Sequence, residues 1–265
     1  MILSFITANY VGQALNYTGN DWSAHERATI AAATPATFRT MAARVAAMGF
    51  THIDIWKGHC SWQFHPVSFA RDVRSICADL GLTITSYAGG ISPNAPADFD
   101  APFAFMNELG APIFAGGIWS PMASPELAAA IESACQKHHV HFALEAHVEN
   151  TLAEILTRID HGGHPHYGIC FDTGWCAPRH LDALAILRQI RPFLKIVHLK
   201  DIHRPDTGQR GSCTLGSGAV AVEAVLRELH SWNFPGPICI EHEPFDHDPS
   251  PELAEGLRRA RTWLT

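Results

Sequence analysis

The sequence alternates strand-like and helix-like segments eight times, and this alternation limits the folds that the chain can adopt. Short runs rich in β-branched and aromatic residues predict eight strands, which are Ile2–Tyr10, His52–Trp56, Thr83–Tyr87, Pro112–Gly116, His141–Ala146, Tyr167–Asp172, Leu194–Leu199 and Pro237–Glu241. Segments with apolar residues on one helical face predict helices, which are Thr37–Met48, Phe69–Leu80, Phe99–Leu109, Pro125–Lys137, Leu152–Ile159, Leu181–Ile190, Val220–Leu229 and Glu252–Leu264. At about 33 residues per unit, this pattern predicts an α/β protein, a single (β/α)8 TIM barrel over residues 1–265.

A doubly wound sheet is the alternative arrangement of alternating strands and helices. It usually carries a glycine-rich phosphate turn after its first strand, whereas this chain reads ANYVGQ there. Gly49, Gly81 and Gly110 follow predicted helices, where a C′ glycine belongs. Ser124 and Ser250 each precede a proline at a predicted helix start, which favours them as N-caps. No linker or tandem repeat divides the chain, so one domain is expected.

The charge balance disfavours a nucleic-acid partner. The chain has 19 basic and 26 acidic residues and a net charge of −7 with histidine neutral, whereas binding to a phosphate backbone needs a basic surface. Its seven cysteines form no CxxC pair, and several lie within apolar segments. They indicate buried free thiols in a reducing compartment. The N-terminus lacks the basic start of a signal peptide, and no apolar stretch approaches the length of a membrane helix. A cytoplasmic protein without membrane contact is expected.

Four apolar runs in the second half each present a side chain able to bind a metal. The runs FALEAH, GICFDTG, KIVHLKD and ICIEHE contain Glu145, Asp172, His198 and Glu241. Charged side chains within apolar strands are costly unless they are paired or metal-bound. Each residue taken alone is readily interpreted as a cap, an ion-pair partner or a satisfied core group. Four of them at successive strand ends, where barrel enzymes place their chemistry, favour one shared site.

Three carboxylates and one imidazole suit a single divalent ion. Oxygen-rich sets of this kind favour Mn²⁺, with Zn²⁺, Co²⁺ or Mg²⁺ as alternatives. No cysteine is expected at the same strand ends, so a closed structural zinc site is not predicted.

The second half of the chain resembles a known family. The segments LEAH, CFDTG, VHLKD, LGSGAV and ICIEHE, between Glu145 and Glu243, are similar to the xylose-isomerase-like barrel superfamily, in the branch of tagatose-epimerase-type sugar epimerases and inosose dehydratases. The resemblance implies one divalent metal held by Glu145, Asp172, His198 and Glu241. It also implies that the two glutamates act as acid and base, and that the chain forms homodimers or homotetramers.

The chemistry expected of such a site is proton abstraction beside a carbonyl. A divalent metal polarises the carbonyl, and a carboxylate removes the proton from the neighbouring carbon to give an enediolate. Return of the proton gives epimerisation or isomerisation, and loss of a β-hydroxyl gives dehydration. An isomerase or epimerase of carbohydrate metabolism is therefore the first expectation, and a lyase of the dehydratase type is the next.

Two positions bear on how a substrate is held. Arg204 follows His198 at the spacing that, in several sugar epimerases, places a guanidinium over a substrate hydroxyl; a surface arginine is an equally good interpretation. Many relatives read DTGH after strand six, whereas this chain reads DTGW. Trp175 therefore replaces a polar contact, and an aromatic wall is expected there. This departure weakens the expectation that the chain is an ordinary monosaccharide epimerase.

Further candidate substrate contacts are Trp56, Trp119, His147 and His59. The tryptophans follow predicted strands, and aromatic faces pack well against the C–H faces of sugars. Together with Trp175 they favour a ring-shaped sugar or cyclitol, although loop packing explains each tryptophan taken singly. His147 lies two residues beyond Glu145, on the same strand face. His59 lies in the second loop, where it can contact substrate or form part of a lid.

Three other functions stay open. An apurinic-site endonuclease-like phosphodiesterase would use a similar barrel, but with a three-zinc cluster rich in extra histidines, and the acidic charge disfavours DNA. A carbon-glycoside-cleaving enzyme would use the same proton abstraction beside a keto group. A catalytically silent barrel acting as an assembly subunit is opposed by the intact Glu145 and Glu241.

Overall fold

Eight parallel strands close into a barrel, as predicted. The computed structural model describes residues 1–147, 149–204, 208 and 211–265. Its parallel strands are β1 (Ile2–Ile6), β2 (His52–Trp56), β3 (Thr83–Ile91), β4 (Ile113–Ile118), β5 (His141–Glu145), β6 (Tyr167–Asp172), β7 (Leu194–Ile202) and β9 (Pro237–Glu241). Each pairs in chain order with the next, β6 pairs with β7, and β9 returns to pair with β1, so the ring has no open edge. The short β8 (Ser212–Cys213) adds antiparallel to the end of β7.

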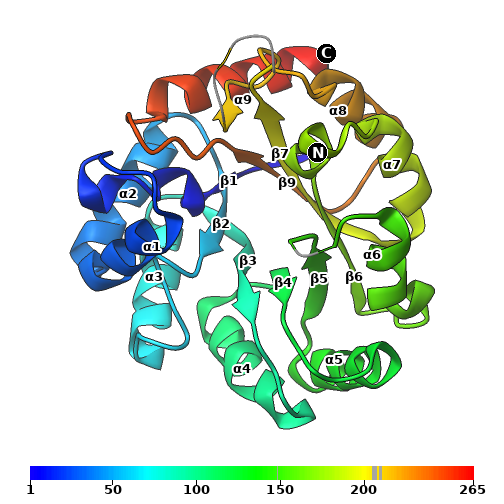
Figure 1. Ribbon diagram of the computed structural model, residues 1–265. Coiled ribbons are helices and arrows are strands. Elements are labelled where there is room, and N and C mark those ends of the chain that lie inside the picture. Colours follow the sequence, from blue (N-terminus) through cyan, green and yellow to red (C-terminus); the bar gives the residue numbers. More distant parts are fainter. Residues whose placement is uncertain (148, 205–207, 209–210) are drawn as a thin grey trace.

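Helices surround this ring of strands (Figure 1). They are α1 (Trp22–Ala32), α2 (Pro35–Ala47), α3 (Val67–Asp79), α4 (Asp100–Leu109), α5 (Ser124–His138), α6 (Leu152–Arg158), α7 (Ala183–Ile190), α8 (Val222–Ser231) and α9 (Ser250–Trp263). Gly49, Gly81 and Gly110 have φ values of 93°, 70° and 80° after α2, α3 and α4. The predicted helix-ending glycines are therefore confirmed, because few other residues tolerate that backbone conformation.

Several element bounds differ from the sequence-based expectation. Strand β1 ends at Ile6, and Thr7–Tyr10 forms a 3₁₀ helix instead of continuing the strand. Helix α1 was not predicted, because only His25 and Thr29 of its residues are buried and it lacks an apolar face. The expected serine caps are wrong: Ser124 and Ser250 are the first residues of α5 and α9, and neither helix has a side-chain cap.

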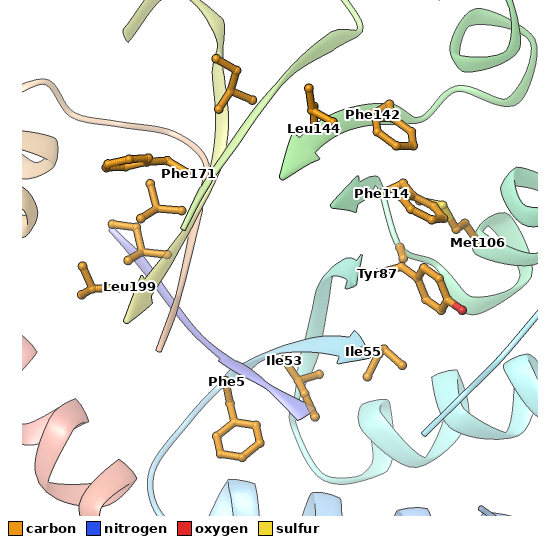
Figure 2. Packing of buried hydrophobic residues seen from close by; sticks show 14 of the residues in the cluster. Phe5, Ile53, Ile55, Tyr87, Met106, Phe114, Phe142, Leu144, Phe171 and Leu199 are labelled. Carbon is orange, nitrogen blue, oxygen red and sulfur yellow. The ribbon is translucent and has the colours of Figure 1, made fainter. Parts of the chain in front are cut away.

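The apolar core forms two separate layers. Large side chains such as Phe5, Tyr87, Phe114 and Phe142 fill the space between the strands and the helices, and Figure 2 shows them on the outer side of the ring of strands. The barrel interior holds a second, smaller cluster that consists mainly of alanines and cysteines, with a few larger residues. The large residues thus hold the helices to the barrel, while small residues leave room inside it.

One buried carboxylate joins α5 to the segment before β6. Glu132 accepts hydrogen bonds from the backbone N–H of His166 (2.9 Å), from its ring Nδ1 (2.6 Å) and from Gln136 Nε2 (2.8 Å). Burial raises the pKa of Glu132, but the bonds from His166 and Gln136 outweigh burial and hold the pKa below its ordinary value of 4.5. The ionised carboxylate therefore stabilises the fold above that pH.

Replacing Glu132 by Gln is expected to lower the free energy of unfolding by about 2 kcal/mol at pH 7, because charge-assisted hydrogen bonds are lost. A lowered folded-state pKa gives stability that is present at neutral pH and is lost as the pH falls through that pKa. The difference between wild type and Glu132→Gln should therefore shrink as the pH falls below 4.5. Urea unfolding at several pH values measures it, with Glu126→Gln on the same helix, where the side chain is exposed, as the matched control. A difference that is independent of pH would contradict this account.

None of the helices in the described part of the chain combines the length and apolarity that a membrane crossing requires. All seven cysteines lie buried as free thiols.

Candidate active site

The carboxyl ends of the strands surround a cavity of about 510 Å³. Parallel pairing brings the candidate residues to one level, since Asp172 aligns with His198 and Lys200 aligns with Glu241. The cavity is lined by acidic, basic and aromatic side chains together with small residues of β3: Trp22, Glu26, Trp56, Lys57, Ala88, Gly89, Gly90, Trp119, Glu145, His147, Asp172, His198, Lys200, Glu241 and Glu243, with Ile6 and Ala8. All four candidate ligands therefore face one space.

His198 lies at the centre of this group. Its Nδ1 is 2.7 Å from Glu145 Oε1 and 3.4 Å from Glu241 Oε2, so side chains of β5, β7 and β9 converge on one nitrogen. Burial raises the pKa of Glu145, but the adjacent His198 ring outweighs it and lowers that pKa to about 2. Glu145 is therefore a carboxylate at neutral pH.

Asp54 of β2 supports His198 from the other side. The Asp54 carboxylate is fully buried, and its Oδ2 lies 3.3 Å from His198 Nε2. A carboxylate next to one ring nitrogen fixes the tautomer and directs the other nitrogen to a ligand. Asp54 is not among the predicted ligands, although an acidic residue in the run HIDIW carries the same signal as the four candidates.

Asp172 reaches the cavity from the end of β6. Its Oδ1 accepts a hydrogen bond of 2.7 Å from the backbone N–H of Gly174, which caps the 3₁₀ turn that follows. Burial raises the pKa of Asp172 above its ordinary value, with the negative Glu145 adding to the effect and the positive Lys200 opposing it.

Lys200 places a positive charge among the carboxylates. Its Nζ donates a hydrogen bond to Glu241 Oε1 at 2.9 Å and another to Glu243 Oε2. Burial lowers the pKa of Lys200, but Glu241, Glu243 and Asp172 outweigh it and raise the pKa well above its usual range. Burial also raises the pKa of Glu243, to about 8, against the effect of Lys200. Side-chain alternation puts His198 with Lys200, and Glu241 with Glu243, on the inner face of the barrel.

Two cysteines lie close to the candidate ligands, although neither is at a strand end. Cys170 groups with Glu145 and His198, and Cys239 groups with His198 and Asp54. Each lies two residues before a candidate ligand on its strand, so it points into the barrel one step deeper. Burial raises the pKa of both thiols, which keeps them protonated and makes them poor metal ligands.

The donor set fits a divalent cation. Glu241 Oε2 is buried and makes no hydrogen bond, although it faces the nitrogen of His198 that Glu145 also approaches. A buried carboxylate oxygen without a partner is costly, and a cation between these groups would satisfy it. Asp172 supplies a further oxygen facing the same cavity.

Aromatic and imidazole side chains form another part of the cavity wall, where His147 Nε2 lies 3.8 Å from Glu145 Oε2. Trp119 is 43% exposed and lines the cavity, so its ring is accessible to a ligand there. Its ring lies against the ends of β3 and β4, where a Cβ on Gly90 or Gly117 would come within 2.5 Å or 2.6 Å of it. His147 contacts the Trp119 ring edge-on at 5.6 Å.

Helix α1 and the end of β2 complete that wall. Trp56 is buried at the end of β2 and meets the Trp22 ring at 5.6 Å. Glu26 of α1 pairs with Lys57 at 2.9 Å. Trp22 and Glu26 are not among the predicted site residues, because their helix was not predicted.

Residues 42–264 match the family model of the xylose isomerase-like TIM barrel. The chain belongs to the xylose isomerase-like TIM barrel family. The match includes the positions of all four candidate ligands and confirms the family resemblance. No curated protein shows significant sequence similarity to the chain.

Solved structures of the xylose isomerase-like type share the fold. One such protein from Mycobacterium smegmatis, in complex with magnesium, is 18% identical with a TM-score of 0.74, over 100% of this chain and 96% of that one. D-psicose 3-epimerase with D-tagatose from Clostridium cellulolyticum H10 is 13% identical with a TM-score of 0.72, over 100% and 99%. The probable 3-DHS dehydratase involved in petrobactin synthesis from Bacillus anthracis is 16% identical with a TM-score of 0.66, over 97% and 98%. At these identities the likeness establishes the fold.

Three predicted substrate contacts of this xylose isomerase-like barrel lie away from the cavity lining. Trp175 is only 5% exposed and packs into the core between strands and helices, with its Nε1 donating to the Glu149 carbonyl at 3.1 Å, so it forms no wall at the mouth. Arg204 lines a different hollow beside α8 and α9, and its Nε donates to the Gly218 carbonyl at 3.0 Å. His59 lies behind the Trp56 ring at 5.7 Å, and burial lowers its pKa to about 4.

The glycine-rich LGSGAV segment of this xylose isomerase-like chain serves an internal carboxylate. Asp201 accepts hydrogen bonds from the backbone N–H groups of Gly216 (3.0 Å), Gly218 (2.8 Å) and Val220 (3.0 Å). These amides resemble a phosphate cradle, but Asp201 already occupies it.

Proposed function

We propose that the chain is a divalent-metal-dependent isomerase or epimerase of a sugar or cyclitol, with a dehydratase of the same substrate class as the second candidate. One observation carries the proposal: the carboxylates of Glu145 and Glu241 approach the same nitrogen of His198 from two strands, inside one cavity. Two carboxylates that flank a substrate carbon can remove a proton from one face and return it to the other.

Glu145, Asp172, His198 and Glu241 would hold the ion, and their oxygen-rich set favours Mn²⁺, with Zn²⁺, Co²⁺ and Mg²⁺ as alternatives. When bound, such an ion polarises a substrate carbonyl and makes the adjacent C–H acidic. The side chains around the cavity would transfer the protons and hold the substrate.

The protein's own residues have distinct tasks in this proposal. Glu145, held ionised beside His198, accepts the proton from the substrate carbon. Lys200 fixes Glu241 through Oε1, and Glu241, which lines the cavity, acts as the second proton-transfer group. Trp119 and Trp56 pack against the C–H face of a sugar or cyclitol ring, and His147 offers a hydrogen bond to a hydroxyl.

The other open functions have weaker support. An apurinic-site endonuclease needs extra histidines around three ions, whereas among the described lining residues only His147 and His198 are histidines. A carbon-glycoside-cleaving enzyme would also use the two glutamates. Only its substrate would distinguish it from an isomerase or epimerase. A silent subunit would not require the buried carboxylates to converge on His198.

The test is deuterium exchange on a panel of unphosphorylated and phosphorylated keto-sugars and keto-inositols. Purified protein is analysed for metal, reconstituted with Mn²⁺, and incubated with each compound in D₂O, with NMR detection. The expected result is metal-dependent deuterium uptake at the carbon beside the carbonyl, with the epimer, the isomer or the dehydrated product formed. Metal-dependent nicking of an abasic duplex with no exchange on any compound would reject the proposal in favour of the endonuclease.

Replacing Asp54 by Asn is expected to weaken Mn²⁺ binding by roughly 10–100-fold, because the amide no longer holds His198 in the tautomer that directs Nδ1 to the ion. Isothermal titration of the metal-free protein measures the affinity. Asp72→Asn, at an exposed position of α3, is the control and should bind as wild type does. Equal affinities for Asp54→Asn and wild type would show that Asp54 does not orient His198.

A further inference from the structure

A second group of ligand-type side chains lies where β9 connects to α9, outside the cavity described above. His242, His247 and Glu252 each offer one atom, and these atoms all lie within 4.8 Å of one another. They face a separate hollow of about 840 Å³, which Ser212 and His203 also line. This hollow gives an ion access from solvent.

Both imidazoles are held through their Nδ1 atoms. His247 Nδ1 lies 2.7 Å from Asp246 Oδ1, and its Nε2 lies 3.0 Å from Glu252 Oε1. His242 is buried, and its Nδ1 lies 2.9 Å from the Ser212 hydroxyl. This arrangement leaves each Nε2 as the ligand atom, and such support of the opposite nitrogen is what orients imidazoles at metal sites.

Glu252 provides an independent indication of a cation. Its Oε1 is engaged by His247, whereas its Oε2 is buried and makes no hydrogen bond. A buried carboxylate oxygen without a partner calls for an explanation such as an ion. Among the described residues, no Lys or Arg forms an ion pair with Glu252.

We propose that His242, His247 and Glu252 form a second metal site, which takes Zn²⁺ or a similar borderline divalent ion. Two imidazoles and one carboxylate with a fourth position open to water form a three-ligand zinc set. The oxygen-rich cavity around His198 prefers harder ions, so the two sites differ in chemistry. The second site does not depend on the proposed function.

An ion at this second site would stabilise the connection between β9 and α9. Phe245 lies on the same connection and packs against His25 at 4.9 Å and Trp22 at 5.9 Å. Glu243, at the start of the connection, contacts Lys200. Zinc would therefore join the start of α9 to the segment that borders the mouth and would hold Phe245 and Glu243 in place.

Cobalt and zinc titrations of the chelator-treated full chain test the site. In wild type we expect an intense visible Co²⁺ absorption, typical of four-coordinate nitrogen and oxygen ligands, and one more bound Zn²⁺ than in His247→Ala or Glu252→Gln. His230→Ala, an exposed position of α8, is the matched control and should behave as wild type. Circular dichroism verifies that each variant is folded.

A further variant separates this proposal from the cavity around His198. Asp172→Asn should leave the intense Co²⁺ absorption unchanged even if it abolishes binding in that cavity. Loss of the absorption in Asp172→Asn would assign the spectrum to the cavity around His198 and overturn the second site. So would equal Zn²⁺ stoichiometry in wild type, His247→Ala and Glu252→Gln.

Discussion

Glu145→Gln and Glu241→Gln are each expected to lower turnover on the identified substrate by about 10³-fold, because a glutamine cannot accept or return a proton. The change is isosteric, so the fold and the cavity should persist. The two variants should nevertheless differ. If each glutamate serves one face of the substrate, one variant should lose deuterium exchange when the reaction starts from one epimer, and the other should lose it from the opposite epimer.

Exchange measured from both epimers, together with metal content, separates proton transfer from simple loss of the ion. Glu126→Gln, at an exposed position of α5, is the matched control and should retain wild-type turnover. If Glu145→Gln and Glu241→Gln both kept full turnover on an identified substrate, the two-glutamate proposal would be wrong. A variant that loses turnover only because it binds no metal would regain it at high Mn²⁺ concentration, and this rescue would assign that glutamate a ligand role alone.

Lys200→Met is expected to be the most destabilising single change at the site. It leaves Glu241 and Glu243 buried without their shared cation, and removing one partner of a buried ion pair costs about 3–5 kcal/mol. For a chain of this size the melting temperature should fall by roughly 10 °C. Thermal unfolding of the metal-free protein, followed by circular dichroism, measures it.

A double variant tests the cause of that loss. Glu241→Gln in the Lys200→Met background removes the stranded charge of Glu241 and should recover part of the stability. Lys137→Met removes a surface pair with Asp100 and should change stability by less than about 1 kcal/mol. A drop of similar size for Lys137→Met and Lys200→Met, or no recovery in the double variant, would show that burial of the charges around Lys200 is not the cause.

The barrel could be predicted from the sequence because its strands are short apolar runs with sharp limits. The bounds of β2, β6 and β9 agree with the predicted ones, since polar or turn-forming residues flank each run. Helix α1 could not be found, because it lies beside the cavity with little apolar surface to bury. Its side chains Trp22 and Glu26 therefore went unnoticed.

The candidate ligands could be placed because alternation along a strand decides which face a side chain occupies. That rule applies to Glu145, His198 and Glu241, which lie within strands. It fails for Trp175, which follows the end of β6 in a 3₁₀ turn that directs its ring into the core. Asp54 satisfies the rule and was overlooked only because it lies in the first half of the chain.

The strands of this barrel contribute different kinds of side chain to the cavity. Strands β5, β6, β7 and β9 supply ionisable side chains to the cavity, whereas β3 supplies Ala88, Gly89 and Gly90. A larger residue at Ala88 would change the shape of the substrate that fits without touching a group that moves protons. Under the proposed function, a change at β3 would therefore alter substrate choice and leave the proton-transfer residues intact.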